Sequence, residues 1–248
     1  MKVNGKTYGM VDEVKKRING HGIAHMELES IDQDIYGENH IGTSVETPLR
    51  DDAFVLNDAD KMEIIQEHFT QILLTLGMDL NDDSIQDTPK RVAKMFVKEI
   101  FSGLNPKNKP SMSVFENKFK YNQMLVEKNI NFNSFCEHHF LPITGKAHVA
   151  YISSRTVIGL SKINRIVNYY AKRPQVQERM TVQIAEELKS VLNTDDVAVI
   201  VEAKHMCVSV RGIQDESSTT VTSDFHGKFK NENTRQELLR YIQMELKD

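Results

Sequence analysis

Residues 161–192 read SKINRIVNYYAKRPQVQERMTVQIAEELKSVL, and this stretch contains two helical patterns with a proline between them. From Ser161 to Lys172 the apolar residues recur every three or four positions, which is the period of one helix face. Pro174 interrupts the pattern because proline cannot continue a helix. The stretch therefore predicts two consecutive helices, and the apolar stripe of the second consists of Val176, Met180, Ile184, Leu188 and Leu192.

Strand-like segments flank these helices on both sides. After them, a buried strand is predicted from Val197 that continues through His205 to Val210, and the β-branched residues of 219–223 predict another. The resulting order is β-β-α-α-β-β, which indicates an α+β fold. Before the helices, the segments with strand character are 113–120, 124–133, 145–152 and 155–159.

The chain before residue 113 has a different character. Two helices are predicted there, the first capped by Asp58 or Asp60 and the second opening with Thr88 and Pro89. The residues that precede them are irregular and rich in acids, as in a partly ordered arm. We therefore expect three parts: an N-terminal arm over 1–57, a helical segment over 58–112 and an α+β domain over 113–248.

The composition is that of a globular protein. Hydrophobic residues make up 40% of the 248 residues, and the net charge of -4 lacks the basic surplus that a nucleic-acid-coating protein needs. No apolar stretch is long enough to span a bilayer, and the N-terminus lacks the apolar region of a signal peptide. We expect a cytoplasmic protein that binds neither nucleic acid nor membranes. In that compartment the chain's 2 cysteines favour a metal-binding or catalytic role over a disulfide.

Both cysteines occur beside histidines. Cys136 precedes His138 and His139, and Cys207 follows His205 by two positions. Residues i and i+2 of a strand share a face, so His205 and Cys207 can point into one pocket. Cys136 and His139 can join them only if their strand ends in a turn, because residues three apart on a flat strand face opposite sides.

Thiolate and imidazole are ligands that zinc prefers, and three protein ligands with one open position are typical of catalytic zinc. Two other interpretations stay open. One is a closed structural site with His138 or His205 as the fourth ligand. The other is the absence of a metal, with each cysteine a small buried residue.

Three cations are candidates for contacts with phosphate. Lys162 and Arg165 lie three apart on the first turns of a predicted helix, after Ser161 as its N-cap, and a helix N-terminus favours anions. Arg211 has the same strand parity as His205 and Cys207. Solvated helix positions and a surface ion pair are the ordinary alternatives for these cations.

An acid and an amide, Glu178 and Gln177, lie in the first turn of the second central helix. An acid at this position normally complements the helix dipole. A functional carboxylate would instead accept paired N–H donors, such as N1 and N2 of guanine. The residue pattern by itself does not choose between these roles.

Seven motifs stand out along the chain: 46–50 (ETPLR), 88–95 (TPKRVAKM), 135–139 (FCEHH), 159–167 (GLSKINRIV), 173–179 (RPQVQER), 205–207 (HMC) and 211–212 (RG). Together they closely resemble the GTP cyclohydrolase I family. They follow one another in the family's order from about residue 46 to the end, whereas residues 1–45 have no clear counterpart. The chain departs from the family pattern at Phe135 and at 224–226, neither of which includes a candidate ligand.

The resemblance implies a fold, a reaction and an assembly. The fold is the tunnelling fold, whose order matches the β-β-α-α-β-β pattern, and the assembly is a toroidal homodecamer with active sites between subunits. The reaction converts GTP and water to formate and 7,8-dihydroneopterin triphosphate, the first step towards folate and pterin cofactors. Alternatives are a zinc tunnelling-fold enzyme for another pterin or purine nucleotide, and a non-catalytic zinc-stabilised scaffold.

The resemblance also implies roles for individual residues. Zn²⁺ would activate water for attack at C8 of guanine, with one histidine donating a proton near N7 and a second assisting. The implied zinc ligands are Cys136, His139 and Cys207, and the implied catalytic residues are His138, His205 and Ser161, the serine near the ribose. Glu178 would bind the guanine edge with Gln177 beside it, and the implied triphosphate contacts are Lys162, Arg165, Arg211, Arg91 and Lys94, the last two from a neighbouring subunit.

Overall fold

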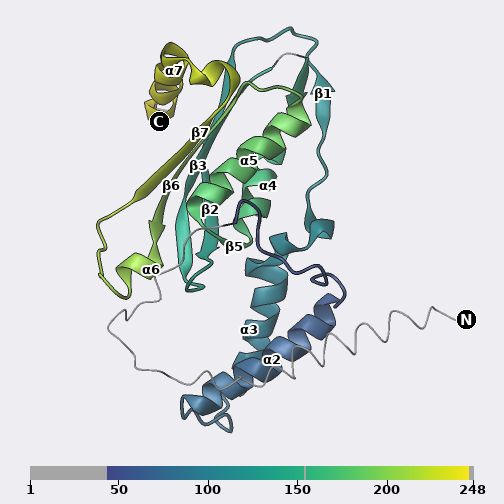
Figure 1. Ribbon diagram of the computed structural model, residues 1–248, viewed down its shortest axis with the longest axis vertical. Helices are drawn as coiled ribbons and strands as arrows, with labels where there is room; N and C mark the ends of the chain where they lie inside the picture. The colour runs from purple at the N-terminus through teal and green to yellow at the C-terminus, as the bar shows by residue number, and fades with distance from the viewer. Residues whose placement is uncertain (1–43, 154, 246–248) are drawn as a thin grey trace, which may run out of the picture. The chain divides into compact units, whose positions relative to one another are not determined.

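The computed structural model describes residues 44–153 and 155–245, so most of the predicted N-terminal arm lies outside the described residues (Figure 1). The chain divides into two compact units, Met1–Glu99 and Ile100–Asp248. Within the described ranges, no helix combines the length and the apolar character that crossing a membrane requires. The three-part division at residues 57 and 112 stays a prediction.

Two helices form the described part of the N-terminal unit, α2 (Asp58–Thr75) and α3 (Thr88–Lys94), and α3 continues into a π-helical turn, Met95–Ile100. The side chain of Asn57 caps α2 by accepting hydrogen bonds from the backbone N–H groups of Ala59 and Asp60. The predicted cap, Asp58 or Asp60, was therefore wrong, because the asparagine before them supplies the accepting oxygen. Pro89 lies in the first turn of α3, as predicted.

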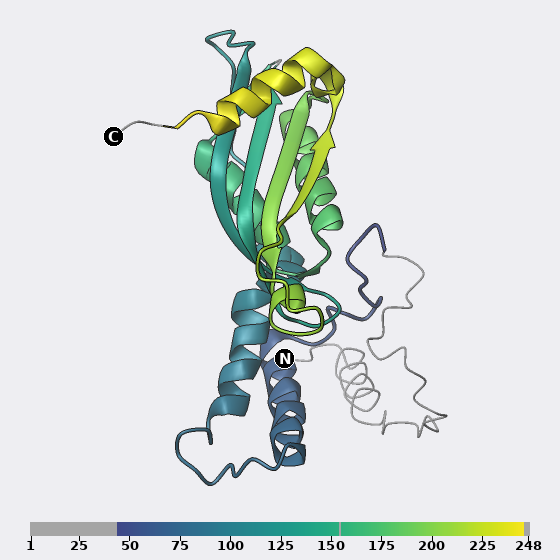
Figure 2. The same cartoon turned by 90° about the vertical axis from the view of Figure 1, so that its left-hand side faces the viewer.

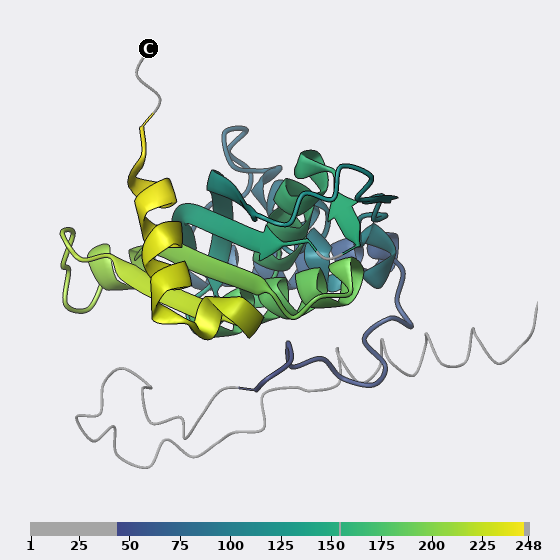
Figure 3. The ribbon, with the colours of Figure 1, turned by 90° about the horizontal axis from the view of Figure 1, so that it is seen from above.

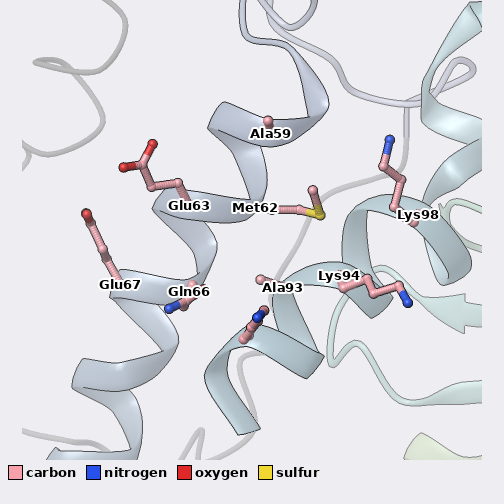
Figure 4. Close-up of a pocket in the computed structure, with 9 residues that line it drawn as sticks. Ala59, Met62, Glu63, Gln66, Glu67, Ala93, Lys94 and Lys98 are labelled. Atoms are coloured by element: carbon pink, nitrogen blue, oxygen red, sulfur yellow. The ribbon is translucent and has the colours of Figure 1, made fainter. Parts of the chain in front are cut away.

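A cavity of about 610 Å³ lies between α2 and α3 within this unit (Figure 4). Its apolar wall includes Met62 and Ala93, and its charged rim includes Glu63 from α2 and Lys94 and Lys98 from the second helix and its π-helical turn. Lys98 also forms an ion pair with Asp58 of 2.5 Å. The structure thus places Lys94, a predicted phosphate contact, on the wall of this cavity.

The C-terminal unit is built on a five-stranded sheet with the strand order β5-β2-β3-β6-β7. The pairs β2–β3, β3–β6 and β6–β7 are antiparallel, and β5 pairs in parallel with the end of β2. A separate antiparallel pair joins β1 (Val114–Glu116) to β4 (Thr156–Ile158). The bounds of the sheet strands are β2 Met124–Cys136, β3 Pro142–Ile152, β5 Pro174–Gln175, β6 Val197–His205 and β7 Thr220–Phe225.

Helices cover both faces of this sheet. On one face lie α4 (Leu160–Ala171) and α5 (Gln177–Leu192), and across the strands on the other runs α7 (Glu232–Gln243), as Figures 2 and 3 show. Strand residues alternate between the two cores: Val149 and Tyr151 pack in the cluster with α4 and α5, whereas Ala150 and Ile152 pack with Leu238 of α7. Burial on both faces explains why β6 begins with an uninterrupted apolar run.

The predicted mixture of helices and strands is confirmed, and the long elements β2, β3, α4, α5, β6 and β7 follow the order β-β-α-α-β-β, with the short strands β4 before α4 and β5 between the two helices. The predicted extent of β6 was wrong. The strand ends at His205, and residues Met206–Ser209 form a short helix, α6. The pairing of β6 with β3 ends where His205 lies opposite Ile143. The residue before Ile143 is Pro142, the first residue of β3, and it has no N–H group that could extend the ladder.

Three chain segments meet at one end of the sheet. In β5, Pro174 and Gln175 pair with Phe135 and Cys136, the last residues of β2. The neighbouring strand β3 brings the end of β6 to the same place, because His205 pairs with Ile143. Figure 1 shows α6 and β5 at this end and β1 at the opposite end.

Candidate active site

The turn after β2 carries the first part of the site. Cys136 is the last residue of the strand and is 5% exposed. Its carbonyl oxygen accepts a hydrogen bond from Phe140 N, and its own N–H donates to Leu141 O, both at 2.8 Å. The chain therefore turns immediately after Cys136, which is the condition under which Cys136 and His139 can face one pocket.

The second part of the site lies at the junction of β6 and α6. Cys207 is in the single turn of α6 and not on a strand, so the parity argument that placed it beside His205 and Arg211 was wrong in its geometry. The short helix nevertheless turns the thiol towards the β2–β3 turn. Potential ligand atoms of Cys136, His139 and Cys207 all lie within 4.8 Å of one another.

The three side chains have the spacing of a metal site. The Cys136 sulfur lies 4.0 Å from Nδ1 of His139. Two ligands of tetrahedral zinc, at ordinary Zn–S and Zn–N bond lengths, are separated by about 3.5 Å. For this pair, an ion requires an approach of about 0.5 Å. Among the described residues, the group whose ligand atoms all lie within this distance of one another has these three members and does not include His138 or His205.

The cluster is a poor environment for a bare thiolate. Burial, and then the neighbouring Cys136, raise the pKa of Cys207 to about 11. A cation at this position would reverse that effect, because a coordinating thiol loses its proton to the metal. The donor set of two sulfurs and an imidazole is one that suits zinc.

His205 is held by a buried glutamine. Gln177 is 1% exposed, and its amide nitrogen donates to the carbonyl oxygens of Val201 and Thr220 and to the Thr222 hydroxyl, at 3.0–3.1 Å. The amide oxygen therefore faces His205, 2.8 Å from Nε2. Because that oxygen can only accept, Nε2 carries the proton and Nδ1 of the neutral ring is the acceptor. Burial lowers the pKa of His205, while Glu178 opposes this shift.

Three further candidates belong to the segments around the cluster. Nδ1 of His138 is 3.7 Å from the Cys136 sulfur, and the ring is exposed. Arg211 donates from Nη1 to Nε2 of His139 over 2.9 Å. Glu178, one residue after the buried Gln177, is exposed at the start of α5. The structure thus brings His138, His205, Arg211 and the cluster of Cys136, His139 and Cys207 to one end of the sheet.

The other predicted contacts with the substrate, Ser161 near the ribose and four cations at the triphosphate, lie elsewhere. Ser161, Lys162 and Arg165 are in the first half of α4, and Lys162 donates to Ser111 O at 2.7 Å. Gly159 occupies the N-cap, so the prediction of Ser161 as the cap was wrong by two residues. The 12 residues of α4 span about 18 Å, and its far end leads into β5 beside Cys136. Arg91 and Lys94 lie in the N-terminal unit, where Arg91 is exposed and 4.0 Å from Asp87.

A family model described as GTP cyclohydrolase I matches residues 65–243. The chain belongs to the GTP cyclohydrolase I family. It is 60% identical over 212 residues to GTP cyclohydrolase 1 of Flavobacterium johnsoniae, which covers 86% of this chain and 95% of that protein. It is 49% identical over 218 residues to the Yersinia enterocolitica protein of the same name, which cover 88% of this chain and 98% of that protein. GTP cyclohydrolase 1 of Citrobacter koseri is 49% identical over 203 residues, which cover 82% of this chain and 91% of that protein. The protein is therefore an enzyme of the GTP cyclohydrolase type.

Sequence reasoning missed two residues of this GTP cyclohydrolase I family member. Glu137 and Arg179 belong to the motifs 135–139 and 173–179, but no role was predicted for either. The structure pairs them next to the metal cluster, with Arg179 Nη1 2.6 Å from Glu137 Oε2. Helical spacing does place Arg179 on the same side of α5 as other buried residues. No pattern in the sequence, however, indicates that its partner is 42 positions earlier.

Proposed function

We propose that the protein catalyses the zinc-dependent hydrolytic opening of the guanine imidazole ring of GTP. The products are formate and 7,8-dihydroneopterin triphosphate, the latter a precursor of folate and pterin cofactors. Membership of the GTP cyclohydrolase I family supports GTP as the substrate. The observation that carries the zinc-dependent part is the convergence of Cys136, His139 and Cys207 within 4.8 Å.

Zinc would be held by Cys136, His139 and Cys207, with the fourth coordination position open to water. Bound there, it would supply the Lewis acidity that generates a hydroxide-like nucleophile at neutral pH. The thiols and the imidazole bind it in their deprotonated forms, and the turn after β2 and the helix α6 hold them in place. The remaining steps are carried by the side chains of the chain itself.

Two histidines are proposed to transfer protons. His138 is exposed beside the cluster and is proposed to donate a proton near N7 of guanine as the ring opens. His205 presents Nδ1 as an acceptor, because Gln177 fixes its proton on Nε2. Both ends of the Gln177 amide are hydrogen-bonded within the protein. We therefore propose that Gln177 acts on the substrate indirectly, by orienting His205.

The guanine ring needs an acceptor for its N1–H and N2–H groups. Glu178 is proposed to fill this role with both carboxylate oxygens, since it is exposed and its charge acts on His205. Charge-assisted bidentate pairs of this kind are strong and directional. They would fix C8 of the base with respect to the metal cluster.

Arg211 is proposed to change partner when substrate binds. When His139 acts as a ligand through Nδ1, its ring proton resides on Nε2, which then cannot accept a hydrogen bond. Arg211 can only donate, so it exchanges His139 for a phosphate oxygen of the substrate. The exchange keeps the guanidinium beside the site while the imidazole holds the metal.

The other phosphate contacts are proposed to come from a second copy of the chain. Ser161, Lys162 and Arg165 lie up to a helix length from the cluster of their own chain. Among the described residues, β7 pairs only with β6, and residues 124–134 of β2 pair only with β3. These open edges support a ring in which β7 of one subunit pairs with β2 of the next. We propose that the protein assembles as the toroidal homodecamer that the family resemblance predicts. Arg91 and Lys94 of a neighbouring subunit would also contribute to each active site.

The test is formate release from GTP by the zinc-loaded protein, with guanosine as the comparison substrate. We expect turnover of GTP and the loss of most activity on guanosine, because the triphosphate contacts are then unused. Protein that holds one zinc per chain and releases no formate would contradict the proposed reaction. Equal turnover of guanosine would contradict the phosphate contacts and favour another purine or pterin substrate.

A further inference from the structure

We propose that Arg179 is a positioning residue for the metal site, acting through Glu137. Together they would fix the turn that carries Cys136, His138 and His139 against the first turn of α5. The inference rests on the proposed zinc site and assigns neither residue a contact with substrate. It concerns how the two ligand-bearing segments are held at the correct separation.

The pair is bidentate and buried. Arg179 Nη1 lies 2.6 Å from Glu137 Oε2, and Nη2 lies 3.1 Å from Oε1. The arginine side chain is 2% exposed and that of the glutamate 16%. Two parallel charge-assisted hydrogen bonds define an orientation as well as a distance, which a single contact to a lysine would not.

Glu137 connects this pair directly to the ligand-bearing turn. It follows Cys136, and its backbone N–H donates to Gln175 O at 3.0 Å, continuing the short parallel pairing of β2 with β5. Its Oε1 also lies 3.8 Å from Nε2 of His138. A shift of the Glu137 carboxylate therefore moves the residues on both sides of it.

The same helical turn also holds the other half of the site. Gln177, two residues before Arg179, contacts His205 at the end of β6 and donates to the carbonyl oxygen of Val201 in the middle of that strand. The first turn of α5 thus contacts the β2–β3 turn through Arg179 and the β6–α6 junction through Gln177. The distance between Cys136 and Cys207 depends on this shared support.

A general stabilising role predicts a different result. A buried ion pair that only supports the fold, when broken, lowers stability and leaves the ligands in the surviving folded protein unchanged. A positioning role predicts weaker metal binding by protein that is still folded. Partners that orient metal ligands typically contribute about 10- to 100-fold to affinity.

The experiment compares Glu137→Gln and Arg179→Lys with a matched control, Glu187→Gln. Glu187 lies on the same helix, its side chain is 10% exposed, and it accepts bonds from Lys109 and Tyr170 away from the cluster. Zinc affinity is measured by competition with a chelating indicator, and the absorption spectrum of the Co²⁺-substituted protein reports ligand geometry. Circular dichroism establishes that each variant is folded.

We expect both site variants to bind zinc about 10- to 100-fold more weakly and to show altered Co²⁺ bands, while Glu187→Gln matches the wild type. Folded site variants with wild-type affinity and spectrum would overturn the proposal, as would an equal loss in the control. If Arg179→Lys does not fold, the double variant Glu137→Gln/Arg179→Gln, which leaves no unpaired charge, decides in its place. Wild-type protein that binds zinc and does not turn over GTP would refute the proposed function alone.

Discussion

The Gln177 amide oxygen lies 2.8 Å from Nε2 of His205, while the nitrogen of the same amide faces two backbone carbonyl oxygens. The carbonyls fix which way the amide points, and the amide in turn fixes the tautomer of the histidine. A buried side chain with no access to solvent thereby determines which ring nitrogen His205 offers to a substrate.

Replacement of Gln177 by leucine is expected to lower kcat for GTP by at least about tenfold, because His205 loses the acceptor that orients it. KM for GTP should change little, since the proposed guanine and phosphate contacts remain. Steady-state kinetics of the zinc-loaded variant measure both constants. The matched control is Gln183→Leu, the same change at another buried glutamine of α5. A Gln177→Leu enzyme with wild-type kcat would show that His205 needs no such support.

The proposed sharing of sites between subunits predicts complementation. Cys207→Ser removes a metal ligand, and Lys162→Ala removes a proposed phosphate contact from the first turn of α4, so each variant alone should be nearly inactive. Co-expression of the two should restore part of the activity, because some sites then combine an intact cluster with an intact α4. Formate release measures the recovery. Co-expressed variants as inactive as either parent would place both residues in the site of one chain.

His148 predicts a pH-dependent stability that is independent of the metal ligands. Burial lowers its pKa below the usual value of 6.5, with Lys146 and Lys128 acting in the same direction and Glu202 opposing them. The unfolded chain therefore takes up the proton first as pH falls. The free energy of unfolding should begin to decline when the pH drops below the pKa of His148 in the unfolded chain. It should continue to decline until the pH falls below the lower pKa of His148 in the folded protein. The total loss should be about 1.4 kcal/mol for each pH unit that separates the two pKa values.

Urea unfolding between about pH 8 and about pH 5, with zinc in excess, measures this decline. His148→Asn retains an acceptor for the N–H of Asn129, which lies 3.4 Å from Nδ1 of His148, and should show a shallower slope. His68→Asn, an exposed position on α2, should keep the slope of the wild type. Identical slopes in all three proteins would remove His148 as the source.

Part of this site could be predicted from the sequence because the relevant residues are few and chemically distinctive. Two cysteines beside histidines left little choice of metal ligand, and the structure brings Cys136, His139 and Cys207 together. The local geometry was less accessible. Cys207 lies on a helical turn because the pairing of β6 with β3 ends at Ile143 and His205, beside Pro142, which is a property of another segment.

Contacts between distant segments were beyond prediction for a similar reason. The ion pair of Arg179 with Glu137 and the contact of Gln177 with His205 arise only after β2, α5 and β6 have packed at one end of the sheet. Periodicity identifies the buried face of α5 but does not name its partners. Likewise, the separation of Lys162 from the cluster follows from the direction of α4, which motif spacing does not reveal.

The most direct test of the central claim is an absorbance assay of dihydroneopterin triphosphate formation. Zinc-loaded wild-type protein is incubated with GTP, and the variants Cys207→Ser and His138→Ala are measured in the same way. We predict turnover by the wild type and near-complete loss in both variants, with zinc lost only from Cys207→Ser and the fold retained in each. Wild-type protein that contains one zinc per chain and forms no pterin would contradict the proposed reaction.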